Sequence, residues 1–348
     1  MTPRVLALSL WIAMPALAHG VDPHAIPLGD GKVSSAPRAG YVYSCMTNFR
    51  GGGAQHAGDW IRGSTWDETR KIAVQGAVSW PDARLSVRAA GDRRVVAGNG
   101  LPTSGTTGTF PVQRSDPAFE IDRNPNAIRS QGVSIELPAA PQLAAQPSCV
   151  PMGPVAITLN GVLLFNALDD AGRDAAAHEV QDRCNGHPER QGRYHYHGPS
   201  PCIPGIDQPN AVIGFAFDGF PITGLVGADG REYGNGDLDE CHGRMDELRV
   251  DGKPVRTYHY AMTREYPYAV GCFRGTPVRL AAAGGPPAPG ERPGRPMPPR
   301  EAVQACEGRG PQAPCGFISP RGDEIRGVCG EPTPGVLACL PGRAPRGF

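Results

Sequence analysis

The hydrophobic positions of this chain fall into short runs that are separated by clusters of glycine, proline, asparagine and aspartate. Short runs rich in β-branched and aromatic residues predict β-strands joined by turns. The expected strands lie at residues 41–45, 71–80, 85–87, 94–96, 110–112, 133–137, 155–159, 162–165 and 213–217. The strongest turn signal is Asn160-Gly161 between two apolar runs, which predicts a β-hairpin.

One stretch favours a helix instead. Residues 169–182 include Ala175, Ala176, Ala177, Glu179 and Gln181, which are good helix formers, and Asp169 or Asp170 is a suitable N-cap. Glycine (47 residues) and proline (38) are abundant and only 7% of residues are aromatic, which favours a loop-rich protein over a helical bundle. The expected fold class is therefore mainly β, a β-rich α+β domain with short helices and long loops.

The charges of the chain balance, with 34 lysines and arginines against 34 aspartates and glutamates. This balance leaves no basic field for nucleic acid, so we expect no nucleic-acid partner. The sequence also lacks the Gly-x-Ser-x-Gly elbow of serine hydrolases and the glycine-rich phosphate-binding loop.

The N-terminus has the pattern of a Sec-type signal peptide over residues 1–18. Arg4 supplies a positive start, residues 5–16 are mostly apolar, and Ala16-Leu17-Ala18 is an Ala-x-Ala cleavage site. The apolar run is too short to span a membrane. We therefore expect cleavage near Ala18, export to the periplasm or the medium, and no membrane span. The even set of ten cysteines fits disulfide bonds in an oxidising compartment.

Composition divides the rest of the chain into four parts. Residues 19–40 are expected to form a disordered leader, and residues 41–275 a disulfide-bonded main domain. Residues 276–299 contain a proline- and glycine-rich run that predicts a flexible linker. Residues 300–348 are too few for an independent core, so their four cysteines predict a small module held by two disulfides, in any of three pairings.

The most informative polar pattern is Tyr194-His195-Tyr196-His197. Residues two apart in a strand point to the same face, so His195 and His197 should stand side by side, with the tyrosines on the other face. Two adjacent imidazoles can form half of a metal site, and His187 lies just upstream. A polar strand with hydrogen-bonded histidines is the alternative.

A weak internal repeat adds further candidates. Asp-x-Cys-x-Gly precedes Tyr-His-Tyr twice, at residues 182–196 and 239–260. Two such units could pack about a pseudo-two-fold axis and converge their histidines on one pocket. The ligand candidates are then His187, His195, His197 and His259, with His242 in reserve. Asp182 and Asp239 could orient imidazoles from outside the ligand set, or could equally serve as turn residues.

The repeat also predicts how the cysteines of the main domain pair. Each copy has one later cysteine, which gives Cys184–Cys202 and Cys241–Cys272, and elimination leaves Cys45–Cys149.

A second type of metal site is expected at Asn235, Asp237 and Asp239, where oxygen donors alternate along a glycine-rich loop in a way that suits calcium. The spacing does not complete an EF-hand loop, and turns rich in aspartate and asparagine are common without a metal.

With these motifs in order, the chain resembles the YHYH-domain family of exported proteins, named for the tetrapeptide at 194–197. The resemblance covers about residues 41–275, and it includes Asp122-Arg123-Asn124-Pro125-Asn126, Cys184-Asn185-Gly186-His187-Pro188 and Phe217-Asp218-Gly219-Phe220-Pro221. It implies an exported protein and carries no established activity.

Three functions are compatible with these features. The first is an exported protein that binds copper or zinc through its histidines, with a slight preference for copper. The second is a metal-dependent secreted hydrolase or oxidase of unknown substrate, which would use the same site with an open coordination position. The third is a structural or adhesive module without a transition metal.

Overall fold

A computed structural model describes residues 20–49, 51–278, 300–318, 324–333 and 336–341 of the chain. The predicted signal peptide and most of the predicted linker lie outside these residues. The chain divides into two compact units, Met1–Ala283 and Gly284–Phe348, and each is described by itself. The described residues of both units are mainly β, as predicted.

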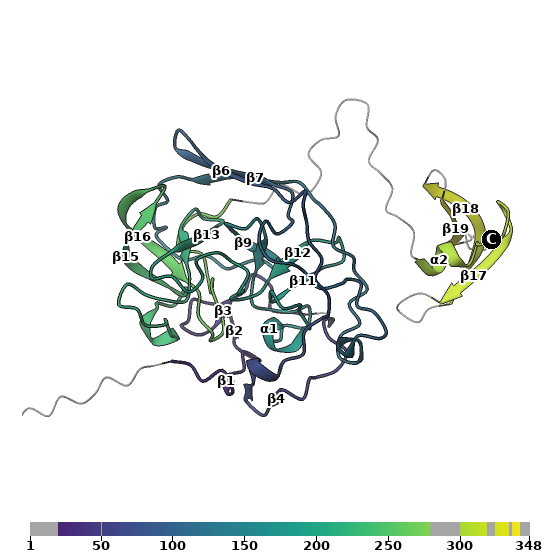
Figure 1. The fold of residues 1–348 in the computed structure, drawn as a ribbon, viewed down its shortest axis with the longest axis horizontal. Coiled ribbons are helices and arrows are strands. Elements are labelled where there is room, and N and C mark those ends of the chain that lie inside the picture. Colours follow the sequence, from purple (N-terminus) through teal and green to yellow (C-terminus); the bar gives the residue numbers. More distant parts are fainter. Residues whose placement is uncertain (1–19, 50, 279–299, 319–323, 334–335, 342–348) are drawn as a thin grey trace, which may run out of the picture. The chain divides into compact units, whose positions relative to one another are not determined.

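The first unit is built on one eight-stranded sheet (Figure 1). From edge to edge its strands are β11 (Gly186–Pro188), β12 (Tyr194–Tyr196), β10 (Leu163–Phe165), β9 (Pro154–Thr158), β13 (Val212–Ala216), β14 (Pro221–Thr223), β16 (Lys253–Ala261) and β15 (Gly243–Val250). The predicted hairpin at Asn160-Gly161 is confirmed, because β9 and β10 pair antiparallel across it.

The sheet consists of two halves with the same topology, joined where β9 pairs antiparallel with β13. In each half a hairpin, β9–β10 or β13–β14, is followed by a strand that pairs in parallel with its outer member, β12 or β16. A final antiparallel strand, β11 or β15, forms the edge. The internal repeat in the sequence is therefore a repeat in the structure.

Shorter elements surround the sheet in the first unit. The small strands are β1 (Ile26–Pro27), β2 (Val33–Ser34), β3 (Val42–Tyr43), β4 (Ile61–Arg62), β5 (Thr65–Trp66), β6 (Leu85–Ala90), β7 (Arg93–Gly98) and β8 (Val133–Pro138). The helical elements are α1 (Ala175–His178) and the 3-10 turns Glu68–Arg70, Pro117–Glu120 and Asn235–Asp237. The expected strands at 71–80 and 110–112 are wrong: residues 71–80 make only isolated bridges, and 110–112 form loop.

The expectation of a disordered leader is corrected for residues 20–40. Ile26 of β1 is 1% exposed and pairs with Trp66. The backbone N–H of Gly29 donates to the Asp174 carboxylate over 2.9 Å, and Asp30 lies 2.9 Å from Nε2 of His178. These contacts join the segment to α1, and composition alone did not reveal them.

The predicted helix at 169–182 is mostly a turn. The Asp169 carboxylate accepts hydrogen bonds from the backbone N–H groups of Ala171 and Arg173, and Gly172 has φ 76°, outside the helical region. The helix begins only after Asp174, which caps it, and ends at His178. Its brevity places the next residue, Glu179, in an extended conformation at the end of α1.

The three disulfides predicted for the main domain are confirmed: Cys45–Cys149, Cys184–Cys202 and Cys241–Cys272. Each closes a long loop and so restricts the unfolded chain. Both faces of the sheet are buried: Ile157, Leu163 and Phe215 lie on one face and Ile222 on the other, and all belong to one hydrophobic core. None of the helices in the described part of the chain has the length and apolar character of a membrane span.

The second unit has the predicted cysteine-paired form. Its described elements are α2 (Arg300–Gln304), β17 (Pro314–Ile318), β18 (Glu324–Thr333) and β19 (Val336–Pro341), with the strands in one antiparallel sheet. The pairing is Cys306–Cys329 and Cys315–Cys339. The four half-cystines make up most of its small buried cluster, which fits a module that depends on disulfides.

Candidate metal centre

The β11–β12 hairpin brings the three upstream histidines together. His187 and His195 are direct partners across the antiparallel pair, where side chains on one face lie close. His197 follows His195 by two residues and lies on the same face, as the strand period predicts. Ligand atoms of these three buried residues lie within 4.8 Å of one another.

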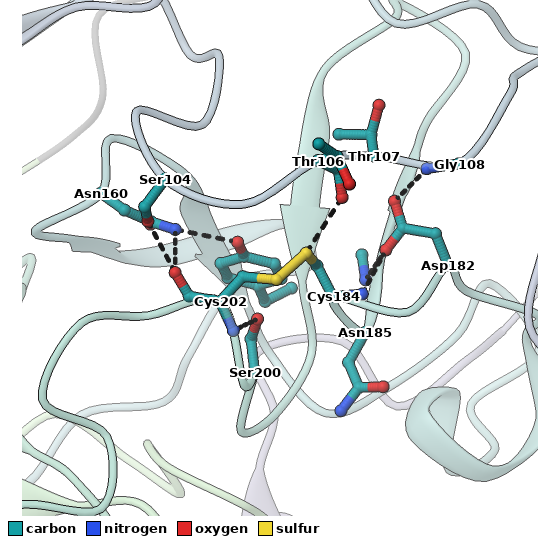
Figure 2. Close-up of a disulfide and its surroundings, with 12 residues drawn as sticks. Ser104, Thr106, Thr107, Gly108, Asn160, Asp182, Cys184, Asn185, Ser200 and Cys202 are labelled. Atoms are coloured by element: carbon teal, nitrogen blue, oxygen red, sulfur yellow. Dashed lines mark hydrogen bonds between the residues drawn. A yellow bond between two sulfur atoms is a disulfide. The ribbon is translucent and has the colours of Figure 1, made fainter. Parts of the chain in front are cut away.

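The tyrosines between the histidines anchor the strand on its other face. Tyr194 donates its hydroxyl hydrogen to Asp182 over 2.9 Å, and Tyr196 accepts from Nδ2 of Asn160 over 3.0 Å. Asp182 also accepts from the N–H of Gly108 over 2.8 Å (Figure 2). It accepts from the N–H of Gly186 over 3.2 Å. Asp182 thus serves as a turn residue and makes none of its hydrogen bonds to an imidazole, so the geometry favours the second of its two predicted roles.

A fourth donor comes from Glu179. Its Oε2 lies 3.4 Å from Nε2 of His187 and 3.3 Å from Nε2 of His197. The sequence had indicated Glu179 only as a helix former. Its role depends on the early end of α1, which turns the side chain towards the hairpin.

Hydrogen bonds determine which ring nitrogens of His195 and His197 carry a proton. Nδ1 of His195 lies 3.1 Å from the carbonyl oxygen of Arg193, and Nδ1 of His197 lies 2.6 Å from that of Asn166. A carbonyl only accepts, so both Nδ1 atoms are donors and both neutral rings present a lone pair at Nε2. These two Nε2 atoms face each other at 3.1 Å. Lone pairs at that distance repel unless a proton or a metal ion lies between them.

His187 is held differently. Its Nδ1 faces the amide nitrogen Nδ2 of Asn124 at 3.5 Å, at the outer limit of a hydrogen bond. In the metal-free protein this contact places the His187 proton on Nε2, directed at Glu179. A metal ion bound by Nε2 would require the neutral ring to carry its proton on Nδ1 instead, where the Asn124 amide nitrogen could no longer donate to it.

Burial makes these groups unusual. His187, His195 and His197 are 4%, 2% and 4% exposed. Burial, and then the neighbouring histidines, hold the pKa values of His187 and His195 well below the ordinary value, while burial raises the pKa of Glu179. Among the described residues, Nε2 of His187 and Oε2 of Glu179 have no hydrogen-bond partner, a costly state for buried polar atoms.

The donor spacing fits a metal ion. Donors about 2.0–2.2 Å from a tetrahedral zinc ion are separated by about 3.3–3.6 Å. The separations here are 3.1 Å between His195 and His197, 3.3 Å from His197 to Glu179, and 3.4 Å from His187 to Glu179. Imidazole suits zinc, copper, iron and nickel, and the carboxylate would contribute a negative charge. The four residues could therefore hold a divalent transition metal.

His259 does not join this group. It occupies the place of His195 in the other half of the sheet, and five strand spacings of about 4.8 Å put roughly 24 Å between the two strands. Its Nε2 lies 3.0 Å from Asp246, and its Nδ1 lies 3.0 Å from Thr223. In that half Arg244 replaces His187 and Ala261 replaces His197. The repeat exists, but its pseudo-symmetry separates equivalent histidines instead of converging them.

The other candidates lie in the second half as well. Asp239 repeats the role of Asp182: it accepts from the hydroxyl of Tyr258 over 2.9 Å and from backbone N–H groups of its own turn. His242, at φ 73°, bonds Thr263 through Nε2 over 2.9 Å. The calcium candidates Asn235, Asp237 and Asp239 each bond to the protein, which leaves calcium an untested prediction.

Comparison with known proteins finds a family match that includes the β11–β12 hairpin. Residues 134–232 match the family described as YHYH protein, so this part of the chain, which includes Glu179 and all three clustered histidines, is a YHYH-family domain. No curated protein and no solved structure matches the chain. The family membership and the five disulfides fit an extracytoplasmic location.

Proposed function

We propose that this is an exported metal-binding protein that holds one zinc or copper ion between His187, His195, His197 and Glu179. The observation that carries the proposal is the pair of Nε2 lone pairs of His195 and His197, which face each other at 3.1 Å beside the Glu179 carboxylate. A divalent cation between the three histidines and Glu179 would bind both lone pairs and so remove this repulsion.

The site supports metal retention better than catalysis. Catalytic zinc sites commonly have three protein ligands and leave a fourth position for water or substrate. Here Glu179 stands at the fourth position, and the side chains of His187 and His197 are only 5% and 4% exposed. A secreted metal-dependent hydrolase or oxidase would require Glu179 to leave the metal. An ion held in this way would join β11, β12 and the end of α1.

The remaining alternative is a structural module without a transition metal. In that case a proton shared by the His195 and His197 rings, with Glu179 as the counter-charge, would replace the metal. This metal-free form has a higher free energy than the metal-bound form, because burial disfavours both the imidazolium and the carboxylate.

The test is the metal content of protein purified from the periplasm, measured by elemental analysis beside a His195→Ala/His197→Ala double variant. His259→Ala is the matched control, because this buried histidine occupies the equivalent strand position in the other half. We expect about one zinc or copper per chain in the wild type and in the control, and none in the double variant. Folded wild-type protein that contains no metal and takes up none would exclude the proposal.

A further inference from the structure

Residues 122–126, here called the positioning loop, reach the candidate metal centre from a distant part of the chain. The sequence Asp122-Arg123-Asn124-Pro125-Asn126 contains no proposed ligand. We propose that the positioning loop fixes where Glu179 and His187 stand as metal ligands, and that Asn124 acts on His187 through its hydrogen bond to the Pro188 carbonyl. The proposal rests on the metal-binding function and assigns the loop a role in the affinity of that site.

The first contact of the loop is with the ligand Glu179. Asp122 is 6% exposed, and its Oδ2 accepts from the backbone N–H of Val180 over 3.3 Å. Val180 directly follows Glu179 at the point where the chain leaves α1. The Asp122 carboxylate therefore holds the backbone direction that places the Glu179 side chain beside the histidines.

The second contact is with the ligand His187. Asn124 is 7% exposed, and its Nδ2 donates to the carbonyl oxygen of Pro188, the residue after His187, over 3.0 Å. The same Nδ2 lies 3.5 Å from Nδ1 of the His187 ring. The amide cannot turn freely, because its Oδ1 accepts from the N–H of Asn126 over 3.1 Å. Asn126 adds a second bond to the Pro188 carbonyl, over 3.3 Å.

The other half of the sheet provides an internal comparison. There Met245 occupies the position equivalent to Pro188, opposite the first tyrosine of the Tyr-His-Tyr strand. Met245 is 44% exposed, so among the described residues no loop covers it as residues 122–126 cover Pro188. The position of His187 belongs to Arg244, and Gly236 stands three residues before Asp239, as Glu179 stands three before Asp182. The positioning contacts thus occur in the half that has the ligands and not in the half that lacks them.

The test measures zinc and cobalt(II) affinity of the full-length protein, with the visible spectrum of the cobalt form as a report on ligand geometry. Asn124→Ala should weaken binding about 10–100-fold, the usual effect of losing a residue that orients a ligand, and should change the cobalt spectrum. Asn99→Ala is the control, because Asn99 is 1% exposed and also makes two side-chain bonds to backbone, to Asp82 and Arg84. It should change neither quantity.

Asn126→Ala is the second variant, because it removes only the other bond to the Pro188 carbonyl. It should weaken zinc binding at least about threefold, less than Asn124→Ala, because the Asn124 bond to Pro188 remains. This variant keeps the proposal falsifiable if Asn124→Ala does not fold. An Asn124→Ala affinity within threefold of the wild type, or an Asn126→Ala affinity equal to the wild type, would overturn the role of the loop. Failure of the wild type to bind either metal would instead overturn the proposed function.

Discussion

Replacing Glu179 by glutamine should have opposite effects with and without metal. The change keeps the size and one carbonyl oxygen of the side chain but removes its charge. In the metal-free protein Glu179 Oε2 is buried without a partner, and burial raises the pKa of the carboxyl group. A neutral amide relieves that cost, so Glu179→Gln should leave the metal-free protein equally or slightly more stable.

In the metal-bound protein the same change removes a charged ligand. Residues that only orient ligands already contribute 10–100-fold to affinity, so we expect a loss of at least about 100-fold. With metal in excess, a 100-fold weaker Kd lowers the free energy of unfolding by about 2.7 kcal/mol. At about 2–4 °C per kcal/mol this corresponds to a fall in Tm of about 5–10 °C.

The assay is thermal unfolding of wild type and Glu179→Gln, each with excess zinc and with chelator, beside zinc titration calorimetry. Glu247→Gln is the control, because Glu247 is an exposed glutamate of β15. The reasoning would be refuted if the Kd of Glu179→Gln stayed within threefold of the wild type. It would also be refuted if the variant lost as much stability in chelator as in zinc.

Three further predictions follow from the structure. The Cys184–Cys202 disulfide closes a loop that contains all three clustered histidines, so replacing both cysteines by serine should weaken zinc binding at least about tenfold. The same change at Cys241–Cys272 should lower only thermal stability. Equal zinc affinities in the two variants would contradict this prediction. Burial lowers the pKa of Lys71 from 10.5 to about 8, so between these values the unfolded chain binds more protons and the stability of the wild type relative to Lys71→Met should rise with pH. Between pH 7 and 10 the difference in unfolding free energy between wild type and Lys71→Met, measured with denaturant, should grow by roughly 1–2 kcal/mol; this figure is reduced because Lys71 is partly exposed. A difference that does not change with pH would refute a buried amine with a lowered pKa. Tyr194→Phe removes a bond to Asp182 and should cost about 1–3 kcal/mol in denaturant unfolding, and a change below about 0.5 kcal/mol would exclude that bond as a stabilising one.

Part of the candidate site was predictable because it depends on local periodicity. His195 and His197 share a face because residues two apart in a strand do so. His187 was a candidate because it lies just upstream, and the structure adds that it pairs with His195 across the β11–β12 hairpin. The internal repeat likewise predicted Cys184–Cys202 and Cys241–Cys272 correctly. These inferences need only the chain near the histidines and its second copy.

The rest depends on contacts that local pattern does not encode. The sequence placed Glu179 within an expected helix and so did not indicate it as a ligand. Its position follows from the turn at Gly172 and the N-cap at Asp174. Gly172 and the N-cap residue Asp174 are the sequence signals that could have shortened the predicted helix. The placement of His259 depends on which strands meet at the centre of the sheet, and the antiparallel pairing of β9 with β13 sends the two Tyr-His-Tyr strands to opposite sides.

The most direct test of the central claim is a crystal structure of the purified protein with diffraction data collected at the absorption edges of zinc and copper. The account predicts one anomalous peak about 2.0–2.2 Å from Nε2 of His187, His195 and His197 and from a carboxylate oxygen of Glu179. The absence of a peak between the three imidazoles and Glu179 would contradict the account. A peak beside His259 and Asp246 instead would also contradict it.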